Sequence, residues 1–438
     1  MQRTHAEAAE FATIIDLAHD GRGVARLDGK TVFVHDALPG EQVGLVRRRR
    51  KRRHDEAVLA AVMSASPDRV TPGCPHFGTC GGCALQHLAT PRQLEHKQTI
   101  LLENLARLGR VAPTSVLPPL ASMPWGYRRR ARLGVRWVAP KQRVLVGFRE
   151  RASSYLADIA VCRVLAPPLD RLITPLAQMI AGLSVRARLP QIEAAVADNA
   201  TALVLRVLDP LCETDLVTLG AFARAHQIQL HLQPGGYETI APLEEGYGPL
   251  YYELPEFDLR IAFEPPDFVQ VNGELNRRMI ARALDLLAPG HSDRVLDLFC
   301  GLGNFSLPLA RSAEQVVGVE GDASLVERAR ANARRNGVPN ATFEMANLFE
   351  DCRDSRWAAG RYDRVLLDPP RAGALQVLPL LARFSPARLV YISCHPGSLA
   401  RDAGLLVHEH GYRLVVAGVM DMFPHTAHVE SIAVFEPR

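Results

Sequence analysis

Long apolar runs are the first feature that this chain of 438 residues lacks. No stretch of about 18 consecutive apolar residues occurs anywhere, so we expect no segment to span a membrane. The opening residues carry charges throughout and contain no apolar stretch like that of a secretory signal peptide. We therefore expect a cytoplasmic protein, in which structural disulfides are rare and grouped cysteines indicate metal binding or catalysis.

A strong net charge is also lacking, since the formal value at pH 7 is only +4. The positive charges are nevertheless concentrated in two places. Seven consecutive cations occupy residues 47–53, and residues 125–137 place five arginines among aromatic side chains. Cations neutralise phosphates and aromatic rings stack on unpaired bases, so the two runs together indicate a polyanionic partner such as RNA. The alternative is a solvated charged face, and one run alone would not decide between the two.

The length predicts about two to four domains. Residues 10–68 alternate apolar and polar in short bursts punctuated by glycine, which predicts an all-β, oligonucleotide-binding-like barrel of five strands with a hairpin turn at Leu27–Lys30. Residues 69–262 read as a mixed α+β domain, with a helix over 91–111 that we expect to pack on the C-terminal domain. In residues 263–438, apolar strands alternate with helices, which predicts a doubly wound, Rossmann-like α/β domain.

A third glycine is missing from the loop that follows the first strand of this last domain. Residues 295–310 run from a strand containing Asp297 through a glycine turn into a helix, but Ser306 stands where the dinucleotide fingerprint G-x-G-x-x-G has its last glycine. Glu320, at the end of the next strand, can accept both hydroxyls of a ribose. The combination favours S-adenosylmethionine, with a dinucleotide enzyme or an inactive relative of the fold as the alternatives.

Further polar side chains follow later strands, at the edge where this fold places its chemistry. Asn347 follows the third strand and can meet an adenine, and Asp368 follows the fourth, in the sequence D-P-P. This element is similar to one that amino-group methyltransferases use to orient a planar substrate. Those enzymes usually carry an aromatic residue after the prolines, whereas this chain has Arg371, which indicates different chemistry.

A candidate nucleophile, Cys394, ends the fifth strand. A random cysteine is more often a small buried hydrophobe. Here, however, the strand end faces the same crevice as Asp368, and we expect His395 and the following helix N-terminus to lower the pKa of the thiol. A thiolate beside a methyl donor predicts methylation at carbon 5 of uracil, because its addition to carbon 6 makes carbon 5 nucleophilic.

That reaction needs a base to remove the carbon-5 proton. Glu430 precedes the last strand, with His425 and His428 nearby, and desolvation there would raise the pKa of its carboxyl group. Most glutamates are solvated or cap helices, so only the complete set of residues supports this role.

A fourth cysteine is missing beside the segment CPHFGTCGGC, which carries Cys74, Cys80 and Cys83 in the spacing C-x5-C-x2-C. A tetrahedral sulfur site needs four ligands. Cys162 stands alone after a strand of the central domain, and elimination of the other cysteines leaves it as the fourth ligand. Cys300 and Cys352 lie in the predicted cofactor domain. Cys212 opens a predicted helix, and Cys394 is the candidate nucleophile. Four thiolates suit zinc and an iron–sulfur cluster alike, and spacing does not choose between them.

Taken together, these motifs resemble the bacterial 23S ribosomal RNA uracil-5-methyltransferases that carry an iron–sulfur cluster, and more broadly the RNA uracil-5-methyltransferases. The resemblance covers nearly the whole chain. It is carried by CPHFGTCGGCALQH, FVQVN, DLFCGLGNFSLPLA, LLDPPRAG, SCHPGSLARD and HTAHVES. The cysteine segment and the motif around Cys394 are specific, whereas many methyltransferases share the glycine loop.

The resemblance implies an RNA-binding barrel of the TRAM type, a 4Fe–4S cluster on the four cysteines, and a class I methyltransferase domain that uses S-adenosylmethionine. It implies that Cys394 is the nucleophile and Glu430 the base. The implied cofactor contacts are Gln270, Phe299, Asn304, Glu320, Asn347 and Asp368, of which Gln270, Phe299 and Asn304 rest on the resemblance alone.

The implied partner is 23S ribosomal RNA, whose target uridine must leave its stack to reach the crevice. A sister branch that acts on transfer RNA generally lacks the barrel and the clustered cysteines, so the chain looks like the ribosomal branch. Two further hypotheses are an RNA-binding or ribosome assembly factor with a vestigial cofactor fold and a base-modifying enzyme that acts on DNA. We expect a monomer with no obligate protein partner.

Overall fold

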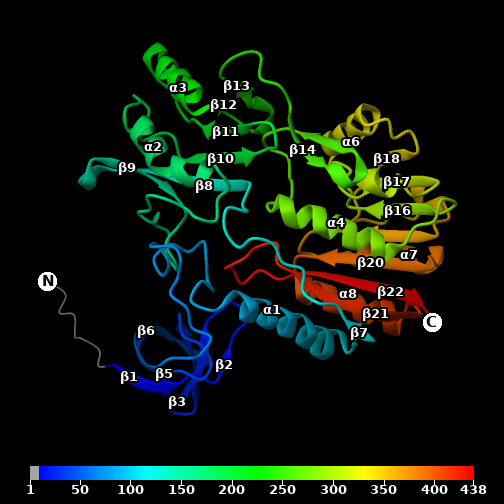
Figure 1. Cartoon of the computed structure of the whole chain (residues 1–438), viewed down its shortest axis with the longest axis horizontal. Coiled ribbons are helices and arrows are strands. Elements are labelled where there is room, and N and C mark those ends of the chain that lie inside the picture. Colours follow the sequence, from blue (N-terminus) through cyan, green and yellow to red (C-terminus); the bar gives the residue numbers. More distant parts are fainter. Residues whose placement is uncertain (1–8) are drawn as a thin grey trace.

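Six short strands build the N-terminal part of the protein in the computed structural model, which describes residues 9–438 (Figure 1). They are β1 (Glu10–Thr13), β2 (Asp16–Leu17), β3 (Gly23–Leu27), β4 (Lys30–His35), β5 (Gln42–Arg50) and β6 (His54–Ser64). Their order is β1-β5-β6-β4-β3-β2, and β1 also contacts β3. The predicted hairpin is confirmed, because Leu27 pairs with Lys30 while Asp28 and Gly29 have φ of 50° and 76°. The sixth strand, β2, has two residues and is too short to show as alternation in the sequence.

A second sheet forms the central part. Its strands are β8 (Arg130–Val138), β9 (Arg143–Gly147), β10 (Gln191–Val196), β11 (Thr201–Arg206), β12 (Ile228–Gln233) and β13 (Ala241–Pro242), in the order β13-β12-β11-β10-β8-β9. The helices are α2 (Leu169–Ala181) and α3 (Glu213–His226), with 3-10 turns at Ala139–Lys141 and Tyr237–Thr239. Strands and helices thus share one core, as the α+β interpretation expects.

The C-terminal part is an eight-stranded sheet in the order β18-β17-β16-β19-β20-β22-β21-β7. The strands are β7 (Ser115–Val116), β16 (Arg294–Leu298), β17 (Gln315–Glu320), β18 (Ala341–Met345), β19 (Arg364–Leu367), β20 (Arg388–Ser393), β21 (Tyr412–Met420) and β22 (Glu430–Pro437). The helices are α4 (Gly273–Leu287), α5 (Ser306–Leu309), α6 (Ala323–Arg335), α7 (Leu378–Phe384) and α8 (Pro396–His408), with 3-10 turns at Trp357–Ala359 and Leu375–Val377.

Strands β16 to β20 are parallel, and β22 runs antiparallel to both β20 and β21. Helices cover both faces. Ile280 of α4 and Val326 of α6 pack in one core, and Leu399 of α8 packs in the other. The doubly wound α/β prediction is confirmed, with an antiparallel edge added.

Two segments that precede residue 263 in the sequence pack on this C-terminal sheet. The hairpin of β14 (Leu250–Leu254) and β15 (Leu259–Phe263), joined by a 3-10 turn at Pro255–Phe257, buries Leu254 and Ile261 in the core that contains α4 and α6. Helix α1 (Thr90–Asn104), which continues as a π-helical turn at Leu105–Gly109, packs against β21 and α8 (Figure 1). The catalytic core is therefore built from more of the chain than its C-terminal part alone.

Within residues 9–438, no helix is long and apolar enough to cross a bilayer.

Candidate active site and cysteine pocket

Four acidic or thiol side chains lie where neighbouring parallel strands end. Asp297 and Glu320 belong to the ends of β16 and β17, and Asp368 and Cys394 directly follow β19 and β20. Because these strands are parallel and adjacent, their carboxyl ends open at one edge of the sheet. The charges of Asp368 and Glu320 reach Asp297, and those of Asp368 and Glu430 reach Cys394. The structure therefore gathers these residues into one crevice.

The register of β20 and β22 brings Cys394 and Glu430 together. Ser393 pairs with Ser431, and the Ser431 hydroxyl donates to the Ser393 carbonyl oxygen at 3.1 Å. Continuation of this register by one residue would set Cys394, which directly follows β20, opposite Glu430, and the charge of Glu430 acts on the Cys394 thiol. A thiol and a carboxyl group from segments distant in the sequence thus face the same space.

Burial raises the pKa of both Cys394 and Glu430. It raises the pKa of the Cys394 thiol to about 11, and the carboxyl groups of Glu430 and Asp368 reinforce the effect, while Arg371 opposes it. Burial, reinforced by Asp368, also raises the pKa of Glu430 well above its usual range. The Cys394 thiol therefore keeps its proton at neutral pH in the free protein, and burial favours the protonated form of Glu430. A raised pKa makes the ionised form of Glu430 a stronger proton acceptor than an exposed carboxylate.

The expectation that His395 and the following helix lower the pKa of Cys394 is wrong. His395 is the N-cap of α8, and its Nδ1 accepts a hydrogen bond from the Ser398 amide at 3.1 Å. Its side chain is thus used to begin the helix. Burial and the two carboxyl groups outweigh the helix N-terminus and the one nearby cation, so the pKa of the thiol rises.

Arg371 of the D-P-P-R sequence is exposed, and its Nη2 lies 3.1 Å from Nδ1 of His428. Arg371 is also the cation that opposes the raised pKa of Cys394. The loop after Asp368 and the loop before Glu430 therefore meet at this contact, beside the thiol.

Sequence reasoning missed the side chain that anchors the D-P-P loop. Asp402 of α8 is fully buried and accepts hydrogen bonds from the Tyr391 hydroxyl at 2.6 Å and the Ala374 amide at 2.8 Å. Its other oxygen pairs with Arg401, which also donates to the Ala372 carbonyl at 2.8 Å. The only sequence signal was an aspartate at the end of the SCHPGSLARD motif, which alone does not reveal its partners.

The glycine loop holds an unusual carboxyl group. Asp297 is fully buried; its Oδ2 accepts from the Ser306 hydroxyl, while its Oδ1 has no partner in the described structure. Burial raises the pKa of Asp297 to about 7, aided by Asp368 and Glu320 and opposed by Ser306. Ser306, which replaces the missing glycine, thus has a role of its own. An unpartnered buried oxygen is costly unless a ligand supplies a donor.

Glu320 organises the turn beside it. Its Oε2 accepts from the Gly301 amide at 3.1 Å, and its Oε1 accepts from the Gly321 and Asp322 amides at 2.7 and 3.1 Å. Gly301 has φ of +53°, a conformation that glycine adopts at no steric cost. The carboxylate is therefore fixed at the mouth of the glycine loop.

Phe299 lies next to a second aromatic ring, Phe349, which no motif in the sequence pointed to. Phe299 adopts a left-handed backbone conformation, with φ of +64°, and its ring centroid lies 5.7 Å from that of Phe349. Asn347 is exposed, and its side chain bonds to two nearby residues. Its Nδ2 donates to Glu350 at 2.7 Å, and its Oδ1 accepts from the Phe349 backbone amide at 3.2 Å. Two rings and a carboxamide at this edge suit a planar heterocycle such as adenine.

Asn304 is held by two other polar side chains. It exchanges hydrogen bonds with Asn276 of α4 at 2.9 and 3.0 Å, and its oxygen also accepts from the Tyr252 hydroxyl at 2.8 Å. These contacts tie the glycine loop to α4 and to the β14–β15 hairpin. Gln270 lies apart from this network, half-buried in the segment that leads to Asn272, the N-cap of α4.

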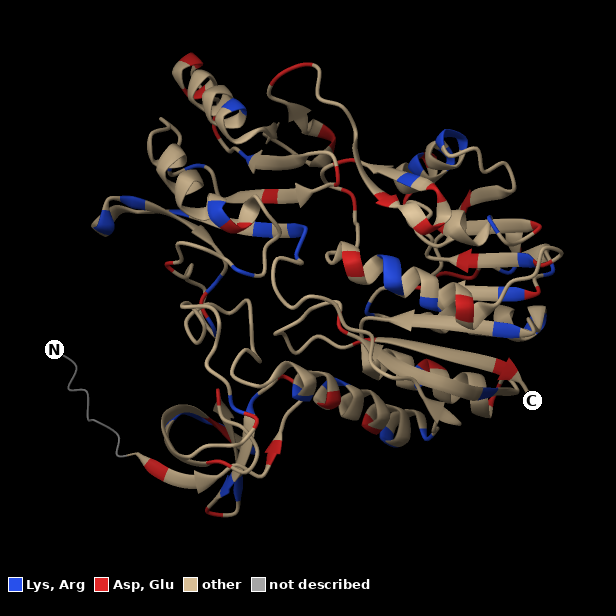
Figure 2. Cartoon of the chain, viewed as in Figure 1, with Lys and Arg blue, Asp and Glu red and all other residues tan. Residues whose placement is uncertain are grey.

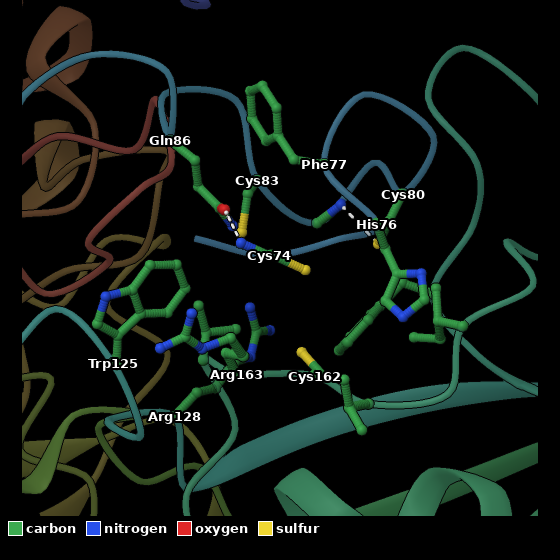
Figure 3. Close-up of a pocket in the computed structure, with 15 residues that line it drawn as sticks. Cys74, His76, Phe77, Cys80, Cys83, Gln86, Trp125, Arg128, Cys162 and Arg163 are labelled. Atoms are coloured by element: carbon green, nitrogen blue, oxygen red, sulfur yellow. Dashed lines mark hydrogen bonds between the residues drawn. The ribbon is translucent and has the colours of Figure 1, made fainter. Parts of the chain in front are cut away.

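The four predicted cysteine ligands line one pocket between the cysteine segment and the central domain. Figure 3 shows Cys74, Cys80, Cys83 and Cys162 around a shared cavity. All four are free thiols, and Cys162 is buried. The segment is held in place by a hydrogen bond from the Cys74 amide to Gln86 at 3.0 Å. Within residues 9–438, no three potential ligands lie close enough together to hold a single metal ion.

The two basic runs, residues 47–53 and 125–137, differ in the contacts that their arginines make. Arg48–Arg50 are exposed, whereas Arg47 is only 9% exposed and pairs with Glu10 and Asp55 at 2.7 and 2.9 Å. Basic and acidic segments are interspersed over the whole chain in Figure 2.

The second basic run is divided between internal contacts and solvent, since Arg132 and Arg136 are exposed. Arg129 pairs with Asp198, Arg132 pairs with Glu193 at 2.9 Å, and Arg130 donates to the Pro265 carbonyl. The Trp125 ring packs on His425 with centroids 4.1 Å apart. The Trp125 ring is therefore in contact with His425, and a base-stacking surface on this run stays a prediction.

Two family descriptions match parts of this chain. Residues 206–437 match the family described as tRNA (Uracil-5-)-methyltransferase, and residues 12–44 match the TRAM domain. A relative from Alkalilimnicola ehrlichii, named 23S rRNA (uracil(1939)-C(5))-methyltransferase RlmD, is 54% identical over 436 residues, covering 99% of this chain and 98% of the relative. A relative of the same name from Stenotrophomonas maltophilia is 52% identical over 440 residues, covering 100% and 99%.

The chain belongs to the RlmD family of RNA (uracil-5-)-methyltransferases. A solved structure, the Pyrococcus abyssi tRNA (uracil-54, C5)-methyltransferase with S-adenosyl-L-homocysteine, covers 97% of this chain and 100% of its own. It has a TM-score of 0.75 and 25% sequence identity. The RlmD-family assignment confirms the resemblance seen in the motifs, the TRAM domain and the class I methyltransferase fold.

Proposed function

We propose that this RlmD-family chain transfers a methyl group from S-adenosylmethionine to carbon 5 of uridine 1939 in 23S ribosomal RNA. The names of the two relatives support the substrate. The observation that carries the chemistry is the placement of Cys394 opposite Glu430, through the pairing of Ser393 with Ser431. A nucleophile and a proton acceptor on one face match the two protein groups that methylation at carbon 5 of uracil requires.

In the proposed reaction, the Cys394 thiol first gives its proton to solvent, the thiolate bonds to carbon 6 of uracil, and the electron pair of the 5,6 double bond becomes an enolate. When bound, S-adenosylmethionine would supply an electrophilic methyl group to carbon 5, with the sulfur–methyl bond breaking and the sulfur leaving as a neutral thioether. Glu430 then removes the carbon-5 proton, the double bond re-forms, and the bond between Cys394 and carbon 6 breaks to return the thiolate. The raised pKa of Glu430 suits a group that must take a proton from carbon.

The residues at the glycine loop fit the methyl donor. Asp297 has a buried oxygen without a protein partner, and Glu320 is fixed beside Gly301. A sulfonium and an ammonium group on one ligand would complement this concentration of carboxyl groups. We propose that the donor is held by Gln270, Phe299, Asn304, Glu320, Asn347 and Asp368, with Phe349 as a further contact to the adenine.

The four cysteines are proposed to hold a 4Fe–4S cluster. Their thiols line a single pocket, which fits a sulfur-ligated group. A single zinc ion needs four sulfurs at about 2.3 Å from one centre. Four thiolates suit zinc as well as an iron–sulfur cluster, and the resemblance to ribosomal RNA uracil-5-methyltransferases that carry such a cluster favours the cluster. When bound, the group would join Cys162 of the central part to the segment with Cys74, Cys80 and Cys83.

Binding of RNA is proposed to involve the TRAM barrel, where Arg48–Arg50 are exposed and form no ion pair with another residue of 9–438. We propose that the working unit is one chain, because all the named site residues come from it. We also propose a cytoplasmic location, in keeping with a ribosomal RNA substrate.

The test is methylation of a 23S ribosomal RNA fragment with isotopically labelled S-adenosylmethionine. The wild-type chain should produce 5-methyluridine at position 1939, and a transcript with cytidine there should remain unmodified. Cys394→Ala should abolish turnover, whereas Cys212→Ala, which removes an exposed thiol of the central part, should not. Full activity of Cys394→Ala would exclude the covalent mechanism, and methylation of a transfer RNA transcript instead would change the substrate.

Analysis of the metal content of the same preparation tests the cluster. Iron and acid-labile sulfide in equal amounts, with a brown colour, would support the assignment. A colourless protein with stoichiometric zinc would refute it.

A further inference from the structure

The loop between β21 and β22, residues 421–429, leads directly into Glu430 and is held mainly by segments far from it in the sequence. Asp421 and Lys97 form a buried ion pair at 2.6 Å, and Lys97 also donates to the Phe423 carbonyl at 3.0 Å. The Tyr127 hydroxyl donates to the Pro424 carbonyl at 3.0 Å. The path of this loop is therefore set by α1 and by the segment that follows it.

His425 is the most tightly held residue of the loop. Its carbonyl accepts from the Ala84 and Leu85 amides, both at 2.9 Å, and its amide donates to Oε1 of Gln93 at 3.0 Å. Its backbone has φ of +66°, in the left-handed region, and its side chain is buried. A non-glycine residue persists in this conformation only where its surroundings enforce it, so these contacts determine the shape of the loop.

Gln93 of α1 joins the loop to the cysteine segment. It is fully buried, and its Nε2 donates to the Leu85 and Leu88 carbonyls at 3.0 and 2.8 Å, while its Oε1 accepts from His425. Every polar atom of this carboxamide is thus used at the junction.

The contacts of His425 come from residues that flank the cysteine ligands. Ala84 and Leu85 directly follow Cys83. On the other side, the Trp125 ring packs on His425 and lies under the guanidinium of Arg163 at 4.8 Å. Arg163 directly follows Cys162 and donates to the carbonyl of Gly73, which precedes Cys74. Trp125 and Arg163 also line the cysteine pocket (Figure 3).

We propose that the cysteine pocket braces the loop that carries Glu430, and that Gln93 is a positioning residue in this brace. The inference rests on the proposed roles of Cys394 and Glu430. Ligation of the cysteines would fix the positions of residues 73–74, 83–85 and 162–163, which in turn hold His425 and thereby Glu430. This arrangement gives the cluster a positional role in a reaction that involves no electron transfer.

Loosening of the brace should slow removal of the carbon-5 proton more than it slows attack on carbon 6 and methyl transfer. Cys394 follows β20 in the interior of the sheet and precedes α8, and neither element takes part in the contacts of His425. Attack on carbon 6 and methyl transfer would continue, whereas removal of the carbon-5 proton by Glu430 would slow. A methylated RNA joined to Cys394 should then accumulate.

The test compares Gln93→Met with Gln98→Met in the full-length, metal-loaded protein. Gln98 lies on the same helix but accepts a hydrogen bond from the Val419 amide in β21 at 3.2 Å, outside the loop. Each variant is incubated with the 23S ribosomal RNA fragment and labelled S-adenosylmethionine, and covalent protein–RNA adduct is measured on a denaturing gel. Release should be roughly a hundredfold slower in Gln93→Met, the scale expected for a misplacement of about 1 Å, and near wild type in Gln98→Met.

Glu430→Gln separates the possible failures. If covalent adduct accumulates in Glu430→Gln but not in Gln93→Met, the proposal that Gln93 braces the loop is overturned. If adduct accumulates in neither variant, the proposed role of Glu430 itself is overturned. A parallel loss of adduct and product in Gln93→Met would show a general structural defect and would also overturn the proposal. If Gln93→Met does not fold, Trp125→Leu and Trp125→Phe replace it, and only the leucine variant should trap adduct.

Hydrogen exchange provides a readout that is independent of activity. Removal of iron by chelation should speed exchange in peptides that cover residues 421–430 and 84–93. Peptides from β16 and β17 serve as the internal reference. Unchanged exchange in 421–430, or equal acceleration in the reference strands, would contradict coupling between the pocket and the loop.

Discussion

At the scale of single residues, the site combines groups whose acidity is set by burial. Cys394, Glu430, Asp368 and Asp297 all have raised pKa values, and burial is the largest cause in each case. Low solvation disfavours the charged form of each group. The crevice therefore carries less negative charge in the free protein than the same number of exposed acidic groups would carry.

The pKa of Cys394 leads to a prediction for the free protein. Because burial raises this pKa to about 11, the thiolate fraction should grow about tenfold for each pH unit between 7 and 10. Alkylation of Cys394 by iodoacetamide, followed by mass spectrometry of its peptide, should accelerate in proportion. The alkylation rate of the exposed Cys212 in the same sample serves as the reference for the reactivity of iodoacetamide. A rate that levels off between pH 7 and 9 would contradict a protonated resting thiol.

Residues that act at a strand end or in a short motif could be predicted from the sequence, because the fold class fixes where such positions lie. Asp297, Glu320, Asp368 and Cys394 are of this kind. Gln93, Asp402 and Asn276 could not be predicted, because each depends on a partner distant in the sequence. The internal partners of the arginines in residues 128–132 could not be predicted for the same reason, since a charge run does not reveal which charges are paired inside the protein.

At the scale of elements, helix α1 serves the catalytic sheet although it lies between the barrel and the central part in the sequence. It buries Ile100 and Leu101 in the core that contains α8, and its Lys97 reaches Asp421. The helix pattern itself was visible in the sequence. Its destination was only an expectation, because amphipathicity identifies a buried face and does not identify what covers that face.

The Lys97–Asp421 pair gives a prediction about stability. Both side chains are at most 2% exposed, so Lys97→Met leaves a buried unpaired carboxylate and should cost about 3–5 kcal/mol. The double variant Lys97→Met/Asp421→Asn removes the stranded charge and should recover a large part of that loss. Scanning calorimetry should show the melting temperature of the double variant between those of the single variant and the wild type. Equal melting temperatures for the single and double variants would show that the pair is not coupled.

At the scale of the whole molecule, the cysteine segment is where the three parts meet. Arg151 of the central part donates to Asp36 of the barrel at 2.6 Å and to the Cys83 carbonyl at 3.2 Å. Leu85 and Leu88 share a small core with leucines of the barrel, and the Ala84 and Leu85 amides hold His425. The orientation of the barrel and the path of the catalytic loop thus depend on one irregular stretch of chain.

The exposed arginines of the barrel lead to a prediction about RNA binding. Replacement of Arg48–Arg50 by glutamine should weaken binding and lower the slope of log affinity against log salt by up to about 2 to 3, because each lost phosphate contact removes nearly one released counterion. Replacement of Arg132, which is paired with Glu193, provides the matched control and should leave the slope nearly unchanged. An unchanged slope in the triple variant would mean that these cations face solvent in the complex.

The contact between Lys97 and Asp421 has a consequence for synthesis of the chain. The two residues are separated by 324 positions, so a ribosome working at about 5–20 residues per second reaches Asp421 roughly 15 to 65 seconds after Lys97. For nearly all of that interval, α1 lacks the strand β21 on which it packs. The unit that contains the candidate active site is therefore completed only when the last strands have emerged.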